Sequence, residues 1–204
     1  MTPADLLARG PGAPAELIGK AASVARVLCG KAASGGPRPI KVLLYGDPGV
    51  GKSAICRMVA GCLAEHSSAI HHASGSQVSP DTVRDWLHDL HYRLSGWRVF
   101  WIDEVEAVSP GVEVLLLHFL DRLPDCNAAL FTSNATMAGI TARFQSRTQA
   151  MLIERPAAAA VERFLLDRWP NLGAAAREIA AANGGDVRAS LNDAQMQLDA
   201  EKYS

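Results

Sequence analysis

The chain has 204 residues, of which 49% are hydrophobic and 20% are charged, and its formal net charge is −1. This composition excludes an intrinsically disordered chain, and the near-neutral charge gives no global electrostatic case for nucleic-acid binding. The length has room for one α/β domain with a small appendage.

No targeting or zinc-binding signal is evident in the sequence. The start of the chain lacks a cationic segment followed by an apolar core, and no apolar run approaches the ~18 residues of a membrane span. The cysteines are scattered without a C-x-x-C pair, which argues against a zinc site or a disulfide framework: Cys29, Cys56, Cys62 and Cys126. We therefore expect a cytoplasmic protein without a membrane partner.

The first part of the chain leads into a predicted buried strand. Residues 1–14 hold three prolines and two glycines, which predicts a loose arm. Ala15–Cys29 has apolar residues close to helical spacing, and residues 35–39 then break the chain. The first half of Ile40–Arg57 is a short apolar run with β-branched and aromatic members, as is typical of a buried strand.

The second half of this stretch, GDPGVGKS, fits G-x-x-x-x-G-K-[ST] at every fixed position. Glycines let the backbone turn its N–H groups toward phosphate oxygens, and the following helix adds its positive end. Lys52 can reach the β- and γ-phosphates, while the Ser53 hydroxyl is placed to ligate Mg²⁺. The predicted nucleotide-binding residues of this loop are Gly46, Asp47, Pro48, Gly49, Val50, Gly51, Lys52, Ser53 and Ala54.

Helices and strands alternate after the phosphate loop. We predict helices over Ser53–Glu65, Pro80–Ser95 and Gly111–Leu123. Ala69–His72 is a candidate edge strand, and buried strands are expected over Val99–Ile102, Ala128–Thr132 and Ala150–Ile153. This alternation predicts a mostly parallel sheet. From Ala157 onward the pattern is helical only, so we expect a nucleotide-binding α/β domain over residues 1–155 and a lid of roughly three helices over residues 156–204.

Polar residues follow two of the predicted strands. Asp103 and Glu104 come directly after four apolar residues, which puts them at the carboxyl edge of the sheet, where open α/β sheets bind ligands. Asp103 is a candidate Mg²⁺ ligand, and Glu104 is a candidate base for the attacking water. Asn134, after the next strand, could bond the γ-phosphate or that water. The alternatives are a surface acidic turn and an ordinary strand-to-loop cap.

Five short motifs occur along the chain in a characteristic order. GDPGVGKS, FWIDE and FTSN are followed by FQSRT at residues 144–148 and by GDVRASLN at residues 185–192. This series resembles the AAA+ ATPases and, in finer detail, their clamp-loader branch, the replication-factor-C-like proteins. The resemblance implies a P-loop NTPase fold, with an α/β parallel-sheet core and a small three-helix lid.

The resemblance also implies roles for residues outside the phosphate loop. Arg147 would be an arginine finger inserted into a neighbouring subunit's site, with Arg143 as its rival, so the active species would be an oligomer of AAA+ subunits. Arg188 would be the lid arginine that touches the γ-phosphate. The turn that lies on the adenine would comprise Leu17, Ile18 and Gly19. The catalytic set is then Lys52, Asp103, Glu104, Asn134 and Arg147.

The chain also departs from the clamp-loader pattern. It has no four-cysteine zinc module, and it ends at Ser204 without a collar domain. Glu113 stands near the position of a glutamine that faces DNA in that branch, and Leu117 and His118 stand near basic positions. These substitutions argue against clamp-loader-style DNA contacts.

We therefore expect an oligomeric ATPase that couples the binding and hydrolysis of Mg²⁺-ATP to loading or remodelling in DNA metabolism, acting on DNA or a DNA-bound protein. One alternative is another AAA+ loader or regulator, for helicase loading, transposition or branch migration. A second alternative is a slowly hydrolysing, nucleotide-dependent filament or scaffold.

Overall fold

The structure is a computed structural model that describes residues 1–33, 38–92 and 96–202. Two parts of our predictions lie outside the described residues. They are Gly35 to Pro37 in the predicted chain break, and Leu94 with Ser95 at the end of a predicted helix. Contacts group the chain into two compact units. The first unit comprises residues 1–27, 47–58 and 153–204, and the second comprises residues 28–46 and 59–152. The predicted domains, 1–155 and 156–204, stay a prediction.

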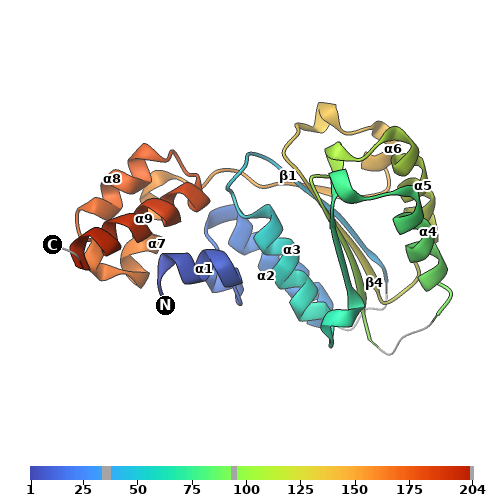
Figure 1. Cartoon of the computed structure of the whole chain (residues 1–204), viewed down its shortest axis with the longest axis horizontal. Coiled ribbons are helices and arrows are strands. Elements are labelled where there is room, and N and C mark those ends of the chain that lie inside the picture. Colours follow the sequence, from blue (N-terminus) through green and yellow to red (C-terminus); the bar gives the residue numbers. More distant parts are fainter. Residues whose placement is uncertain (34–37, 93–95, 203–204) are drawn as a thin grey trace. The chain divides into compact units, whose positions relative to one another are not determined.

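The second unit, whose strands β1 and β4 are labelled in Figure 1, is built on a five-stranded sheet. The strand order is β2-β3-β4-β1-β5. The strands are β1 (Ile40–Tyr45), β2 (Ile70–Ser74), β3 (Arg98–Asp103), β4 (Asn127–Ser133) and β5 (Gln149–Leu152). Every neighbouring pair is parallel, which confirms the predicted parallel sheet. Three of the buried apolar runs that we predicted are the inner strands β1, β3 and β4, which are covered on both faces.

The strand register brings polar strand ends to one edge of the sheet. Tyr45 pairs with Ser133, and Ile102 pairs with Phe131, so the next residues of β3 and β4 are Asp103 and Thr132. Side chains at matching positions of parallel neighbours point to the same face. The phosphate loop leaves the sheet after Tyr45, at this same carboxyl edge.

The two outer strands differ from each other in how well they were predicted. β2 is an edge strand, as expected for Ala69–His72. β5 forms where a buried strand was expected over Ala150–Ile153, but Gln149, Ala150 and Leu152 are exposed. The expectation of burial is wrong for β5 because it pairs with β1 on one side and is the outermost strand on the other.

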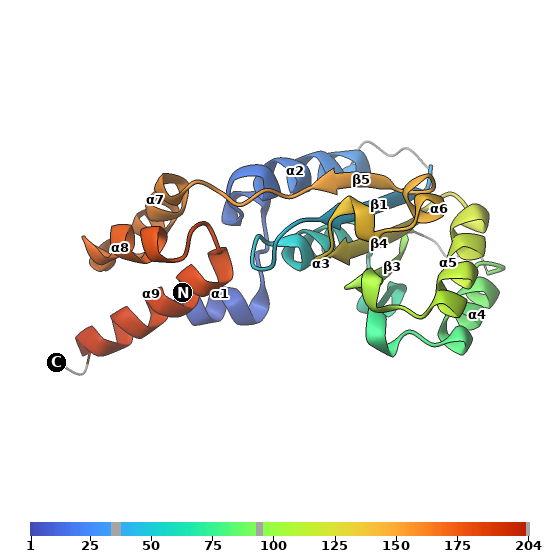
Figure 2. The same cartoon turned by 90° about the horizontal axis from the view of Figure 1, so that it is seen from above.

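Helices α4 (Pro80–Asp89) and α5 (Pro110–Arg122) lie on the same side of the sheet (Figures 1 and 2). They bury a core that includes Phe100, Phe119 and Phe131, and the short helix α6 (Ala142–Gln145) adds Phe144. α4 ends earlier than predicted. The buried Arg98 guanidinium donates hydrogen bonds to the carbonyls of Asp89 and Tyr92, which satisfies backbone groups beyond the helix end.

The first unit contains α7 (Ala158–Arg168), α8 (Ala175–Ala182) and α9 (Val187–Lys202), the three lid helices that the sequence predicts. Helices α2 (Gly19–Ala33) and α3 (Lys52–Leu63) have residues in both units. In the described part of the chain, no helix has both the length and the apolar character needed to cross a membrane.

The N-terminal segment differs from the loose arm that the sequence predicts over residues 1–14. Pro3–Arg9 is helix α1, and Thr2 and Asp5 cap its start reciprocally. Leu6 is buried in the apolar cluster of the lid helices, and Nε1 of Trp169 donates a hydrogen bond to the carbonyl of Met1 at 2.8 Å. These contacts fix a segment whose prolines and glycines had indicated a loop.

Candidate active site

The phosphate loop has the backbone conformation that its glycines allow. Gly46, Gly49 and Gly51 have φ angles of 140°, 78° and 97°, in a region that other residues rarely adopt. The ammonium of Lys52 folds back over the loop and donates to the carbonyl of Asp47 at 2.7 Å. Lys52 is 6% exposed, so its charge is held inside the loop. This conformation is compatible with the phosphate binding that the sequence predicts, which stays a prediction.

Arg155, just before the predicted lid, and Asp186 within it contact the phosphate loop in the first unit. Nε of Arg155 donates to the carboxylate of Asp47 at 2.8 Å. A Cβ added to Gly49 would lie 2.1 Å from Oδ1 of Asp186, so that carboxylate rests directly on the loop. Arg188 follows in the first turn of α9, where its side chain is exposed and has no hydrogen bond or ion pair to another described residue. Its role as the lid arginine stays a prediction.

The predicted adenine turn also lies near the loop. A Cβ added to Gly51 would be 3.7 Å from Cδ2 of Leu17, and one added to Gly19 would be 3.5 Å from Pro156. Ile18 is buried in the same cluster as the lid helices. The first unit thus gathers the turn, the loop and the start of the lid.

The second unit holds Asp103 in a set of hydrogen bonds. Its Oδ1 accepts from Oγ1 of Thr132 at 2.8 Å and from Nε1 of Trp101 at 3.1 Å. Its Oδ2 lies 3.2 Å from Nε2 of His72, whose ring stacks on Trp101 with centroids 3.9 Å apart. Three strands therefore orient this carboxylate.

Glu104 has a left-handed backbone conformation, with φ 56° and ψ 55°. Non-glycine residues seldom adopt this region, and they cluster at functional sites when they do. Nδ2 of Asn134 donates to Oε1 of Glu104 at 3.3 Å, and the backbone N–H of Asn134 donates to Glu106 at 2.8 Å. The structure thus brings together Glu104 and Asn134, which the sequence predicted separately.

Sequence reasoning missed three residues that contact Asp103. Thr132 belongs to the FTSN motif, and its partnership with Asp103 could have been found by placing the two strand ends in register. Trp101 was interpreted as strand core. His72 was predicted only as the end of a candidate edge strand, and no spacing rule links it to a residue 31 positions away.

Asp103 and Ser53 offer the oxygen donors that Mg²⁺ prefers. No group of three or more His, Cys, Asp or Glu residues that could hold a metal exists among the residues that the structure describes. A Mg²⁺ ion held by either donor would therefore take its remaining ligands from phosphates and water, as Mg²⁺ commonly does. The residues present fit the ion.

Arg147 is held by its own chain. Its Nε and Nη2 donate to the two carboxylate oxygens of Asp121 at 2.8 and 3.1 Å, and its Nη1 donates to the carbonyl of Arg143 at 3.0 Å. The pKa of Asp121 is lowered because these hydrogen bonds favour its charged form. Such a bidentate pair fixes both the position and the plane of the guanidinium.

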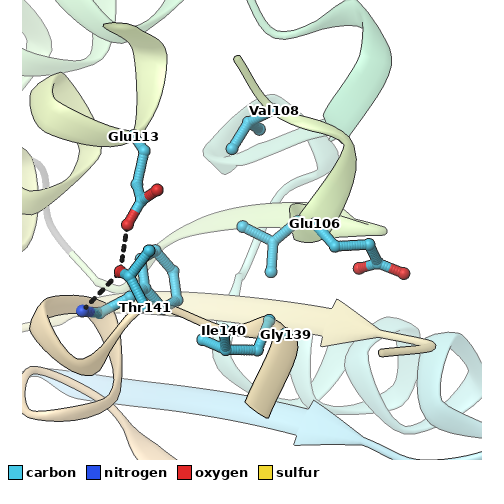
Figure 3. Close-up of a pocket in the computed structure, with 8 residues that line it drawn as sticks. Glu106, Val108, Glu113, Gly139, Ile140 and Thr141 are labelled. Atoms are coloured by element: carbon cyan, nitrogen blue, oxygen red, sulfur yellow. Dashed lines mark hydrogen bonds between the residues drawn. The ribbon is translucent and has the colours of Figure 1, made fainter. Parts of the chain in front are cut away.

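A pocket lies between the start of α5, the segment before α5 and the segment that follows β4 (Figure 3). Glu106 and Glu113 lie on opposite sides of it, over an apolar lining that includes Ile140 and Phe144. The Thr141 hydroxyl donates to the carboxylate of Glu113, as the dashed line shows. Glu113, which stands near the glutamine position of the clamp-loader pattern, is therefore engaged within the protein.

Comparison with known proteins assigns the family. The family model described as "ATPase family associated with various cellular activities (AAA)" matches residues 42–159, more than half of the chain. The chain belongs to the AAA family. The matched residues include the phosphate loop, Asp103, Glu104, Asn134 and Arg147.

The alignments with individual relatives include most of this AAA chain but a smaller share of each relative. Replication-associated recombination protein A of Bacillus subtilis (strain 168) is 27% identical over 179 residues, which are 80% of this chain and 40% of that protein. The structure of the Thermotoga maritima RuvB Holliday junction branch migration motor matches with a TM-score of 0.71 and 21% identity, over 89% of this chain and 62% of that one.

A DNA polymerase III gamma subunit-related protein, also from Thermotoga maritima, matches with a TM-score of 0.63 and 12% identity, over 89% of this chain and 60% of that one. The two structural likenesses show the fold alone. This AAA chain thus spans less than two thirds of the length of each of these relatives. The clamp-loader branch stays a prediction.

Proposed function

We propose that this AAA chain hydrolyses Mg²⁺-ATP with Glu104 as the base and couples the reaction to remodelling in DNA metabolism. The observation that carries the hydrolysis is the meeting of Asp103, Glu104 and Asn134 at the sheet edge where the phosphate loop begins. A carboxylate held by an amide beside a second carboxylate is suited to orient a water and accept its proton.

The proposed roles follow from the chemistry of each side chain. The loop N–H groups and Lys52 bind the phosphates, and Ser53 and Asp103 hold Mg²⁺, which when bound neutralises phosphate charge. Oε1 of Glu104 bonds to Asn134, so the amide fixes how the carboxylate faces the water. Glu104 then takes the proton.

The proposed arginine finger is Arg147, acting on the site of a neighbouring subunit through a head-to-tail interface. In the single chain Arg147 is paired with Asp121, so it would exchange this partner for a phosphoryl group on assembly. Arg143, four residues earlier, is the alternative finger. Arg188, in the turn that follows Asp186, would link the nucleotide to the lid.

The relatives support a role on DNA, since two of their names refer to recombination and branch migration. Within that role, the structure favours recombination-type remodelling over clamp loading. Leu117 is 8% exposed and Glu113 is hydrogen-bonded to Thr141, so two α5 positions that face DNA in the clamp-loader pattern are occupied by inward-engaged residues.

The test is ATP turnover without DNA, with linear duplex and with a four-way junction, together with the mass of the assembly with and without ATP. We expect ATP-dependent assembly and turnover that rises several-fold with the junction. If a sliding clamp with primed DNA raised ATP turnover as much as the junction does, the result would favour clamp loading instead. Tight ATP-dependent assembly with background turnover would contradict hydrolysis and support a scaffold.

A further inference from the structure

The hydroxyl of Thr132 is shared between the two carboxylate residues of the site. Thr132 lies in β4 and is 2% exposed. Its Oγ1 donates to Oδ1 of Asp103 at 2.8 Å and accepts from the backbone N–H of Glu104 at 3.1 Å. One buried oxygen therefore bonds both to the predicted metal ligand and to the backbone of the predicted base.

Only a hydroxyl can make both bonds at this position. A threonine oxygen has one hydrogen to donate and two lone pairs to accept, whereas valine of nearly the same shape has neither. Because Oγ1 accepts from Glu104, its own hydrogen is directed to Asp103. Branching at Cβ also restricts the side chain to few rotamers, so the oxygen is fixed by the strand.

The backbone of Glu104 needs such support because it has a left-handed conformation. The bond from Thr132 holds its N–H, and Gly75 packs against its carbonyl, where a Cβ would come within 2.1 Å of the oxygen. The two peptide units that flank Cα of Glu104, and so aim its side chain, are thus each held by one of these contacts.

Other neighbours of the site contact one carboxylate residue each in the bonds described above. Trp101 and His72 bond to Asp103, and Asn134 bonds to Glu104. Thr132 bonds to both. We propose that Thr132 is a positioning residue that couples the orientation of Asp103 to that of Glu104, an inference that rests on the proposed hydrolysis of ATP at this site.

The experiment compares Thr132→Val, which keeps the shape, with Thr132→Ser, which keeps the hydroxyl. Thr132→Ala is the second hydroxyl-free variant, in case valine does not fold. We expect kcat to fall about 10²-fold in the hydroxyl-free variants, since small misplacements of catalytic groups cost this much. Thr132→Ser should stay near wild type. The affinity for ATP in EDTA, measured by calorimetry, should be unchanged because the phosphate loop is intact.

A second readout does not depend on turnover. The Mg²⁺ concentration that half-saturates the gain in ATP affinity should rise several-fold in Thr132→Val and Thr132→Ala and should be restored in Thr132→Ser. Folded hydroxyl-free variants with wild-type kcat and Mg²⁺ dependence would overturn the inference, as would an equal loss of ATP affinity in EDTA, which would indicate a structural role.

Failure of the proposed function gives a different result. A wild-type chain that binds Mg²⁺-ATP without turnover would defeat the assignment of hydrolysis. The change in Mg²⁺ dependence between the valine and serine variants would still support or overturn the role of Thr132.

Discussion

The phosphate loop and the carboxylate edge of the sheet are held in place by different means. The loop depends on backbone conformation, since Gly46, Gly49 and Gly51 adopt φ angles that side chains disfavour. The edge depends on side-chain hydrogen bonds that join β2, β3 and β4 around Asp103. The loop can be recognised in the sequence from the local spacing of its residues. The hydrogen bonds of the edge form only when strands that are distant in sequence pair. Substitutions in the loop should therefore mainly weaken ATP binding, whereas substitutions at the edge should mainly slow ATP hydrolysis.

The largest effect is expected from a residue outside both regions. Arg147→Ala should lower turnover by about 10³-fold or more, the range known for arginine fingers. Mixing it with Lys52→Ala subunits should restore part of the activity, because one subunit keeps an intact loop and the other keeps an intact guanidinium. The measurement is ATP turnover across mixing ratios.

Arg143→Ala serves to distinguish the two candidate fingers. If Arg143→Ala loses turnover and regains it on mixing with Lys52→Ala subunits, while Arg147→Ala does neither, the finger is Arg143. Mixtures that stay inactive at every ratio would argue against a shared site.

Glu104→Gln tests the carboxylate edge alone. The amide keeps the size of the side chain but cannot take a proton, so kcat should fall about 10²- to 10⁴-fold. ATP affinity and ATP-dependent assembly should be retained, because the loop is untouched. Turnover and nucleotide calorimetry on the same preparation check this. Surviving turnover would mean that Glu104 is not the base.

Gly49→Ala tests the loop alone. A Cβ there faces both a φ of 78° and the carboxylate of Asp186, so ATP affinity should fall about tenfold and the fold should lose about 1–2 kcal/mol. Gly61→Ala is the matched control, since its Cβ meets nothing within 4 Å and it lies in helix α3. It should bind ATP normally and gain up to about 1 kcal/mol. Equal behaviour of the two variants in calorimetry and urea unfolding would contradict the prediction.

The smallest effect concerns His71, the neighbour of His72 on β2. Its ring stacks on Phe100 at 4.9 Å, and burial lowers its pKa below 6.5. The unfolded chain therefore binds more protons below pH 6.5, so the free energy of unfolding falls as the pH drops through that value. His71→Phe should weaken this dependence. Urea unfolding above and below pH 6.5 measures the pH dependence of the free energy of unfolding. The same dependence in wild type and His71→Phe would refute the prediction.

The sequence predicted elements whose signals are local. The inner strands are continuous apolar runs, and the helix of the Gly111–Leu123 prediction is α5 with a shift of one residue at each end. β5 was misjudged because an apolar run does not reveal whether a strand has neighbours on both sides. Helix α1 was missed because prolines and glycines dominate residues 1–14, although Thr2, Pro3 and Asp5 form a capping sequence.

The site was predicted as separate motifs rather than as a network. Asp103, Glu104 and Asn134 were found from their positions after strands, and the structure adds the bond between Glu104 and Asn134. Thr132 was overlooked because its importance depends on the register of β3 and β4. The pairing of Arg147 with Asp121 joins the turn after α6 to helix α5, 26 residues earlier, which no motif encodes.

The N-terminal helix has a practical consequence for following the lid. Because Leu6 packs into the lid cluster and Trp169 bonds to the carbonyl of Met1, α1 would travel with α7 to α9 as one piece. A fluorophore on the exposed Ala8 would then report any movement of the lid helices.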